Sequence, residues 1–289
     1  MGIAADGDRE ASAADPYQAI LDDLDSRAER IETPCADGTV VWRAWGRGEP
    51  LILAHGAQGS WQHWVRNIDS LARDRRVIAV DLPGHGDSAL PETLDHRGIA
   101  KALAHGLEQI LGANAPADLC GFSFGGVCFA HLAAYHPQVA RRLILVGCGG
   151  LGTPHGEVHL QRVSGLRGEA RTAVLRSNLL GLMLHHAESA DGLAIHMLLP
   201  NAKRARLIAA DMVMPDKLLR ILPEVRCRVD AIWGEYDRPH PDPALQQAAL
   251  RSVCPDAGFE VVADAGHWAM YERPQAFERA LHGVFEQAG

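Results

Sequence analysis

Three short segments of the chain each place reactive side chains beside glycines. In chain order they are GFSFG (residues 121–125), GEYD (234–237) and AGHW (265–268). They supply a serine hydroxyl, two neighbouring carboxylates and an imidazole. A serine hydroxyl becomes a strong nucleophile when an imidazole accepts its proton, and a buried carboxylate holds that imidazole in the required tautomer. The three segments therefore point to acyl transfer by an activated serine.

The serine segment lies where a β-rich run gives way to a helix-compatible one. DLCGFS (118–123) leads into it and VCFAHLAAYH (127–136) follows it, and in this context a G-x-S-x-G pattern marks a nucleophile. In so sharp a turn the serine adopts a strained backbone conformation, and side chains two positions away on either side would collide. Gly121 and Gly125 remove those collisions. We therefore expect Ser123 to be the nucleophile.

The acid and the base are expected after two later strands. Asp237 follows the run VDAIWG (229–234) and precedes the turn-forming RPHP, and Glu235 is the nearest alternative acid. The histidine is expected directly after the last strand, where AGHW places His267, and of fifteen histidines only His267 occupies that position. Hydrolases with a G-x-S-x-G turn carry their catalytic residues in the order serine, acid, histidine. We therefore expect Ser123, Asp237 and His267 to form a catalytic triad, with Asp237 preferred to Glu235.

The oxyanion that develops when a serine attacks a carbonyl group needs two hydrogen-bond donors. The backbone N–H of Phe124, directly after the nucleophile, is expected to be one donor. The second is expected in the loop after LILAHG (51–56), where the N–H of Ala57 is best placed. Methionine adapts to irregular apolar surfaces, so methionines of an apolar helical segment are expected to contact the substrate beside two aromatic residues. These four residues are Phe122, Trp268, Met183 and Met212.

The rest of the sequence supplies elements that can hold these residues in place. Seven β-rich runs are separated mostly by helix-length segments, and the runs are strongly apolar. Such runs are typical of a mostly parallel sheet that helices cover on both faces. We therefore predict an α/β fold from the runs at 39–45, 51–56, 77–86, 118–123, 143–148, 229–234 and 259–267.

The regular succession of strands and helices is interrupted once. Residues 151–223 contain no β-rich run, are helical and apolar in character, and hold four of the six methionines. We predict that they form a helical cap, inserted into an α/β core made of residues 35–150 and 224–289.

The N-terminal residues 1–34 differ from the rest in charge. The whole chain has 36 acidic and 28 basic residues and a formal net charge of -8, and more than half of that charge lies in residues 1–30. Asp15-Pro16 can start a helix, and apolar residues then recur at helical spacing as far as Ile31. We predict an acidic N-terminal segment with an amphipathic helix that packs on the core.

Composition also limits the partners. Beyond the N-terminal segment the chain is near charge balance and has no run of lysine or arginine, so we expect neither nucleic acid nor a membrane surface as partner. No signal sequence opens the chain and no run of about 18 or more apolar residues occurs, so a cytoplasmic protein is expected. The six cysteines are scattered without a CxxC pair and are expected to be reduced. We expect a small-molecule substrate, and homo-oligomer formation is left open.

Four histidines of the predicted cap raise the question of a metal site. They form two groups, His155 with His159 and His185 with His186. Neither group has a third ligand at a supporting spacing in the sequence. We therefore expect no metal and no cofactor.

Five motifs together resemble those of the α/β-hydrolase superfamily over about residues 35–285, namely HGAQGSWQHW, VIAVDLPGHGDS, GFSFGG, WGEYD and AGHWAMYERP. The resemblance implies an eight-stranded, mostly parallel sheet with helices on both faces and an inserted helical cap. Within the superfamily the sequence looks most like the capped ester hydrolases and the meta-cleavage-product hydrolases, which split a carbon–carbon bond in dienoic keto acids. The latter usually carry Asn before the nucleophile, where this chain has Phe122.

The leading expectation is a serine hydrolase that cleaves a small, largely apolar carboxylic ester, lactone or thioester through an acyl-enzyme. A carbon–carbon bond hydrolase of the meta-cleavage-product type is the enzymatic alternative. A non-catalytic ligand-binding protein that retains the fold is the alternative from another class, because a fold does not dictate function.

Overall fold

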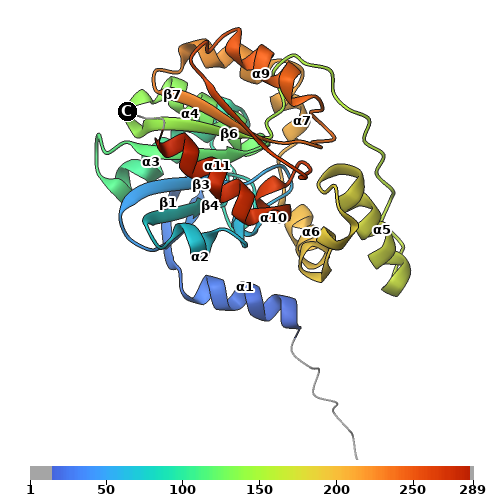
Figure 1. Cartoon of the computed structure of the whole chain (residues 1–289). Coiled ribbons are helices and arrows are strands. Elements are labelled where there is room, and N and C mark those ends of the chain that lie inside the picture. Colours follow the sequence, from blue (N-terminus) through green and yellow to red (C-terminus); the bar gives the residue numbers. More distant parts are fainter. Residues whose placement is uncertain (1–14, 287–289) are drawn as a thin grey trace, which may run out of the picture.

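The centre of the molecule is an eight-stranded β-sheet (Figure 1). The structure is a computed structural model of the chain and describes residues 15–286. In the sheet the strands follow the order β1-β2-β4-β3-β5-β6-β7-β8. β2 pairs antiparallel with both of its neighbours, and all other neighbouring strands pair parallel. The strands are β1 (Glu29–Cys35), β2 (Gly38–Trp45), β3 (Glu49–Ala54), β4 (Arg75–Val80), β5 (Ala117–Phe122), β6 (Ala140–Val146), β7 (Arg228–Gly234) and β8 (Gly258–Val262).

Strand β3 illustrates how the sheet is buried on both faces. Successive side chains of a strand point to opposite faces. Leu51 and Leu53 belong to the hydrophobic cluster on one face, whereas Ile52 and Ala54 belong to the cluster on the other. Because both faces are covered there, the four buried residues from Leu51 to Ala54 are all apolar. The prediction of an α/β fold with a mostly parallel, eight-stranded sheet is confirmed.

Helices cover the two faces of the sheet (Figure 1). Buried residues of α3, α4 and α9 belong to one hydrophobic cluster, and those of α1 and α11 belong to the other. The short helix η1 supplies Trp61 and Trp64 to the second cluster. Outside residues 151–223 the helices are α1 (Pro16–Ser26), η1 (Trp61–Trp64), α2 (Ile68–Leu71), α3 (His96–Leu111), α4 (Phe124–Tyr135), η2 (Pro137–Val139), α9 (Pro243–Arg251), α10 (Ala269–Glu272) and α11 (Pro274–Glu286).

The N-terminal helix α1 begins where the sequence indicated. The carboxylate of Asp15 accepts a hydrogen bond from the backbone N–H of Tyr17 at 2.9 Å, and Leu21 and Leu24 are buried against the core. Such a side-chain cap satisfies a backbone donor that the first helical turn leaves unpaired. Residues 1–14 of the expected acidic segment lie outside the described residues.

The same helix ends earlier than its apolar spacing indicated. The pattern continued to Ile31, but α1 stops at Ser26 and residues 29–35 form the edge strand β1. In β1 the buried residues Thr33 and Cys35 alternate with exposed ones. An alternation with a period of two is typical of a strand that is buried on one side only. The sequence did not reveal this strand because Ile31 also fits the helical pattern that precedes it.

Between β6 and β7 the chain forms helices and no strand, in a stretch that the structure describes throughout. We refer to residues 151–223 as the helical insertion. Figure 1 shows α5 and α6 standing beside the sheet as a group of their own. α6 contacts both α5 and α1, so the insertion packs on the N-terminal helix as well. Its helices are α5 (Gly168–Leu182), η3 (Ala187–Ser189), α6 (Gly192–Arg204), α7 (Ala209–Val213), α8 (Lys217–Ile221) and η4 (Leu222–Glu224).

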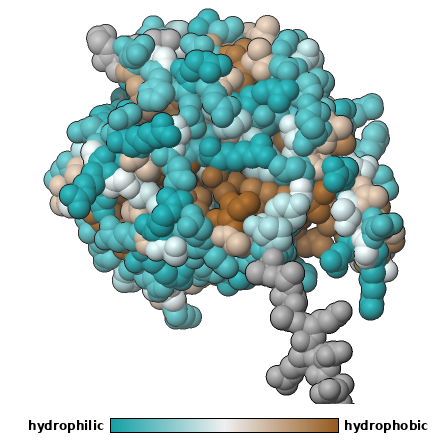
Figure 2. Space-filling view, turned by 60° about the horizontal axis from the view of Figure 1, so that its bottom comes forward, coloured by the Kyte–Doolittle hydropathy of each residue, from teal (hydrophilic) through white to brown (hydrophobic). Residues whose placement is uncertain are grey.

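Figure 2 shows a face of the molecule that is mostly hydrophilic and has hydrophobic side chains gathered in a hollow near its centre. On α1 the side chains of Tyr17 and Ile20 are exposed, although Leu21 and Leu24 on the same helix are buried. Among residues 15–286 no helix is both long enough and apolar enough to cross a membrane.

Candidate active site

Ser123 occupies the turn between β5, which ends at Phe122, and α4, which begins at Phe124. Its backbone has φ 50° and ψ -119°, a conformation that residues other than glycine rarely adopt. The turn is held by a hydrogen bond of 2.8 Å from the Ser123 N–H to the carbonyl of Val146 on β6. Ser123 therefore lies at the carboxyl end of a central strand, where open α/β sheets bind their ligands.

The glycines two positions before and after Ser123 allow three backbone segments to meet. A Cβ atom at Gly121 would lie 2.4 Å from Cα of Gly126, and one at Gly125 would lie 2.5 Å from the carbonyl oxygen of His55. Neither contact can be relieved by a side-chain movement, because both partners are backbone atoms. The start of α4 can therefore pack against β5 and the loop after β3 only with glycine at both positions.

Asp237 and His267 meet after the neighbouring strands β7 and β8. Asp237 Oδ2 lies 2.8 Å from His267 Nδ1, and Asp237 Oδ1 accepts a hydrogen bond from the backbone N–H of His240 at 2.9 Å. Burial alone would raise the pKa of the Asp237 carboxyl. The charge of His267 and hydrogen bonds from His240 and His267 outweigh burial and hold that pKa well below its ordinary value. Asp237 is therefore ionised at neutral pH.

Glu235, the alternative acid, is engaged elsewhere. Its side chain is exposed, and its Oε2 accepts a hydrogen bond from the backbone N–H of Asp264 at 2.9 Å. Of the two acids, Asp237 is the one that is hydrogen-bonded to His267.

Two residues beside the Asp237–His267 pair did not emerge from the sequence. Gly147, directly after β6, has φ 52°, and a Cβ atom there would lie 2.9 Å from Asp237 Oδ2 and 3.2 Å from His267 Nδ1. A side chain at this position would displace the pair. The buried ring of His240 lies with Nδ1 3.5 Å from Asp237 Oδ1. The one sequence signal for His240 is its spacing of three residues from Asp237, inside a segment that reads as a turn.

A cavity of about 290 Å³ opens at this end of the sheet. Ser123 and His267 line it, and so do Ala57 and Phe124, whose N–H groups were expected to face an oxyanion. The remaining lining residues are mainly apolar and come from both the core and the helical insertion. They include Phe122, Leu182, Met183, Val213, Met214 and His240.

Two of the four residues expected to contact the substrate lie away from this cavity. Trp268 is only 1% exposed, and its Nε1 donates a hydrogen bond to the carbonyl oxygen of His63 at 2.9 Å, so its ring belongs to the core. Met212 packs against a hydrophobic cluster of the core. Its neighbours Val213 and Met214 line the cavity instead, because the short helix α7 turns them toward it.

The loop that carries Ala57 is held by two buried histidines. His55 Nδ1 donates to the carbonyl of Gly56 at 2.8 Å, and His55 Nε2 accepts from the N–H of Leu82 at 3.0 Å. His63 Nδ1 accepts from the N–H of Gly56 at 3.2 Å. Burial lowers the pKa of His55 to about 4 and also lowers that of His63. Both rings are therefore neutral at pH 7, which leaves one nitrogen of each free to accept a hydrogen bond.

The loop that carries His267 is tied to the helical insertion by Glu272. The buried carboxylate of Glu272 accepts hydrogen bonds from the backbone N–H groups of Gly266 at 2.6 Å, His185 at 2.9 Å and His186 at 2.7 Å. A carboxylate with three such donors needs no cation beside it to remain buried. Glu272 therefore makes one hydrogen-bonded unit of the loop that carries His267 and the segment after α5.

The chain is similar to several known proteins. A 2-hydroxy-6-oxo-6-phenylhexa-2,4-dienoate hydrolase of Burkholderia cepacia is 30% identical over 257 residues, which cover 81% of this chain and 86% of that protein. The dihydrolipoyllysine-residue acetyltransferase component of the acetoin cleaving system of Pseudomonas putida is 31% identical over 259 residues, or 81% of this chain. The aligned region spans 62% of the length of that acetyltransferase component.

The fold is also similar to known structures. An esterase from Rhodococcus sp. ECU1013 matches it with a TM-score of 0.73 over 90% of this chain and 99% of the esterase, at 23% sequence identity. Residues 51–280 match the sequence family described as the alpha/beta hydrolase family. The sheet order, the strained serine turn and this match agree, and the chain belongs to the alpha/beta hydrolase family.

Proposed function

We propose that this protein is a serine hydrolase that cleaves a small, largely apolar carboxylic ester, lactone or thioester. The observation that carries the proposal is the buried hydrogen bond of 2.8 Å between Asp237 Oδ2 and His267 Nδ1, beside a cavity that Ser123 also lines. With its Nδ1 proton held by Asp237, His267 has Nε2 free to accept the proton of a serine hydroxyl. The family membership of the chain and the hydrolase name of its relative support hydrolysis, without favouring one type of bond.

The proposed reaction passes through an acyl-enzyme. Ser123 Oγ attacks the carbonyl carbon while His267 Nε2 takes the hydroxyl proton, and the N–H groups of Ala57 and Phe124 donate hydrogen bonds to the oxyanion. The carbon–oxygen or carbon–sulfur bond then breaks, and His267 passes the proton to the leaving alcohol or thiol. A water molecule deprotonated by His267 attacks the acyl group, which leaves as an acid and restores Ser123.

The cavity favours a small apolar acyl group. Its volume of about 290 Å³ is at the lower end of the range of about 300–1,000 Å³ for small-molecule sites. Phe122, Leu182, Met183 and Met214 form apolar walls. Each methylene group buried there is worth about 0.8 kcal/mol until the cavity is full. Activity should therefore rise with acyl chain length up to a limit, and charged acyl groups should react poorly.

A carbon–carbon bond hydrolase of the meta-cleavage-product type is the second candidate, because the relative from Burkholderia cepacia has that kind of name. Phe122 weighs against it. Its ring centroid lies 4.8 Å from that of His267, and it offers no hydrogen-bonding group at the position where those enzymes usually carry Asn. A non-catalytic ligand-binding protein of the same fold would have no need for an activated serine.

Labelling with a fluorophosphonate probe tests whether Ser123 is activated. The unaltered protein should be labelled once, and Ser123→Ala should not be labelled. Ser177→Ala, which removes a hydroxyl on α5 that bonds with Gln161, should be labelled normally. Labelling of Ser123→Ala at the normal rate would contradict the proposal.

Turnover of p-nitrophenyl esters of increasing chain length, beside turnover of a dienoic keto acid, distinguishes the enzymatic candidates. We expect ester hydrolysis with a kcat/KM that rises over short to medium acyl chains. Turnover of the keto acid alone would favour the carbon–carbon bond hydrolase, and labelling without turnover of any substrate would favour a ligand-binding protein.

A further inference from the structure

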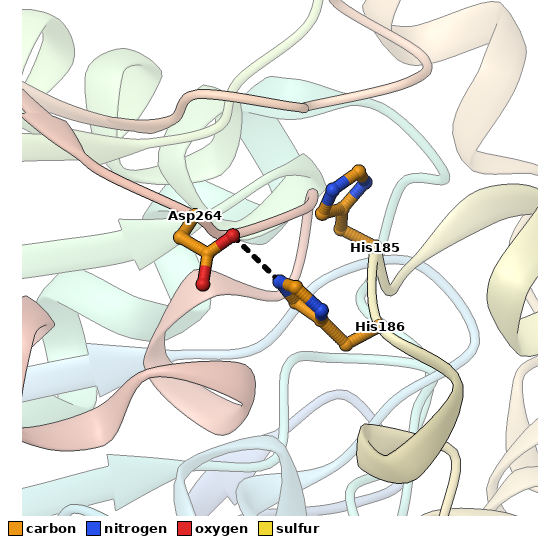
Figure 3. Close-up of side chains that lie close together, drawn as sticks. All are labelled: His185, His186 and Asp264. Carbon is orange, nitrogen blue, oxygen red and sulfur yellow. Dashed lines mark hydrogen bonds and ion pairs between the residues drawn. The ribbon is translucent and has the colours of Figure 1, made fainter.

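Two adjacent histidines of the helical insertion face an aspartate of the core. His185 and His186 lie between α5 and η3, and Asp264 lies in the loop between β8 and His267. Figure 3 shows the three side chains grouped where the two segments face each other. In the sequence, the two histidines lacked a third ligand because Asp264 is 78 positions from His186. The fold supplies that third side chain.

The donor atoms of the three side chains are close enough to bind one ion. One ring nitrogen of each histidine and one oxygen of Asp264 lie within 4.8 Å of one another, and His186 Nε2 is 2.8 Å from Asp264 Oδ1. Around a tetrahedral Zn²⁺ with bonds of about 2.0–2.1 Å, neighbouring ligand atoms lie about 3.3 Å apart. That spacing requires movements on the order of 1 Å, which the exposed side chains of His185 and Asp264 can make by rotation.

The backbone that carries the two histidines is fixed, so the ligands are partly positioned in advance. Glu272 accepts hydrogen bonds from the N–H groups of both His185 and His186. The ring of His185 stacks on that of Tyr236, with centroids 3.9 Å apart and planes inclined by 12°. Because the backbone is already held, only small side-chain rotations have to be fixed when the ion arrives, which limits the loss of conformational freedom.

The surrounding charges also suit a cation. The carboxylate of Glu188 lies 3.6 Å from His186 Nδ1, and its negative charge favours a proton on that nitrogen, which leaves Nε2 available as a metal ligand. Arg273 binds Oδ2 of Asp264 at 2.8 Å, which leaves Oδ1 directed at His186. Three carboxylates lie at this place, Asp264 itself, Glu188 beside His186, and Glu235, which accepts from the backbone N–H of Asp264, whereas Arg273 pairs with Asp264. The local excess of negative charge attracts a positive ion.

We propose that His185, His186 and Asp264 bind one divalent transition-metal ion, with Zn²⁺ as the expected species. Two imidazoles and a carboxylate are a ligand set that Zn²⁺ commonly accepts, and three protein ligands leave one coordination position for water. The ion links the helical insertion to the loop that leads to His267 three residues later. Because the unfolded chain does not hold these ligands together, binding stabilises the folded protein. The proposal is independent of the serine chemistry.

Zn²⁺ binding by the whole, chelator-treated protein tests the proposal. Isothermal titration calorimetry should give about one Zn²⁺ per chain, and thermal unfolding should show a higher Tm with Zn²⁺ than without it. His186→Ala and Asp264→Asn should each weaken binding at least tenfold and abolish the Zn²⁺-dependent rise in Tm. The metal-free Tm of each variant serves as its own reference, so a general loss of stability cannot imitate the result.

Two further variants guard against other binding sites. His159→Ala removes an exposed histidine elsewhere in the insertion, and it should bind Zn²⁺ as the unaltered protein does. His240→Gln alters the buried group of Asp237, His240 and His267, whose donor atoms also lie within 4.8 Å of one another. The absence of saturable binding near one ion per chain would overturn the proposal. So would tight binding by His186→Ala and Asp264→Asn, or loss of binding in His240→Gln.

Discussion

Replacement of Asp237 by asparagine changes one atom at the centre of the proposed mechanism. The backbone N–H of His240 donates to Oδ1 at 2.9 Å, so an asparagine keeps its amide oxygen on that side. The amide nitrogen then faces His267 Nδ1 at the position where Oδ2 now lies, 2.8 Å away. Two N–H donors cannot share that contact, and His267 must place its proton on Nε2. A ring protonated at Nε2 cannot accept the proton of Ser123.

The expected loss is large, because the wrong tautomer removes the general base. Comparable changes in other serine triads lower kcat by about 10⁴-fold, which corresponds to about 5.4 kcal/mol of barrier. Asparagine has nearly the shape of aspartate, so the far-ultraviolet circular dichroism should be unchanged. Steady-state hydrolysis of a p-nitrophenyl ester at pH 7–8 measures the loss.

The matched control is Glu235→Gln. Glu235 is exposed, and its carboxylate accepts from the backbone N–H of Asp264, a hydrogen bond that the glutamine oxygen can keep. We expect kcat to change by less than about threefold, because the loss of one solvent-exposed charge that is not hydrogen-bonded to His267 has little effect. If Asp237→Asn retains a tenth of the activity, or if Glu235→Gln is the more severe change, the assignment of Asp237 is wrong.

Three further predictions concern residues around the candidate site. Gly147→Ala should lower kcat at least tenfold, because its Cβ atom would lie 2.9 Å from Asp237 Oδ2. The control Gly168→Ala has the same φ of 52° but open space around it, so its kinetics should be unchanged. Equal effects of the two variants would show that backbone strain alone is responsible. Glu272→Gln should lower the free energy of unfolding, measured by urea titration, by roughly 2–5 kcal/mol, since an amide cannot replace every hydrogen bond that the buried carboxylate accepts. An unchanged urea concentration at the midpoint of unfolding would refute the role of Glu272 in joining the two segments. Burial lowers the pKa of His131 to about 3, so below about pH 6.5 the unfolded chain binds a proton that the folded chain does not. As the pH decreases, this group should therefore lower the free energy of unfolding by up to about 1.4 kcal/mol per pH unit. Urea unfolding at pH 7 and pH 5 should show a smaller decrease for His131→Phe than for the unaltered protein, and an identical decrease would contradict the prediction.

The strands that could be predicted from the sequence are those whose surroundings are uniform. β5 is buried throughout and β7 is buried except at its first residue, so both are mostly apolar, apart from the buried Asp118 and Asp230, and have no competing helical period. β1 has only two buried residues among seven. Most of its side chains are at least partly exposed to solvent, so they form no apolar run. Ile31 continues the helical spacing of α1 by coincidence. An edge strand of this kind is defined by its pairing with β2, which the local sequence does not record.

The candidate triad could be predicted because a parallel sheet brings the carboxyl ends of its strands to one edge. To predict Ser123, Asp237 and His267, it was enough to identify the strand that each residue follows. The apolar runs identified those strands. A prediction of which residues line the cavity, in contrast, requires the orientation of each side chain. α7 has five residues, too few for helical spacing to distinguish its two sides, so Met212 could not be separated from its neighbours. Trp268 is buried by a contact with His63, 205 positions away, and no local pattern reveals such a contact.

Gly266 shows how a local pattern can identify a residue for an incomplete reason. A glycine directly before His267 suggests a tight turn, but Gly266 does not have the positive φ that would exclude other residues. The requirement comes from packing, because a Cβ atom there would lie 2.8 Å from the backbone nitrogen of His185. The loop that carries His267 and the helical insertion thus meet backbone to backbone, and Glu272 binds N–H groups of both. The position of His267 therefore depends on the insertion as well as on β8, so we expect changes at residues of the insertion that do not line the cavity to affect the proposed reaction as well.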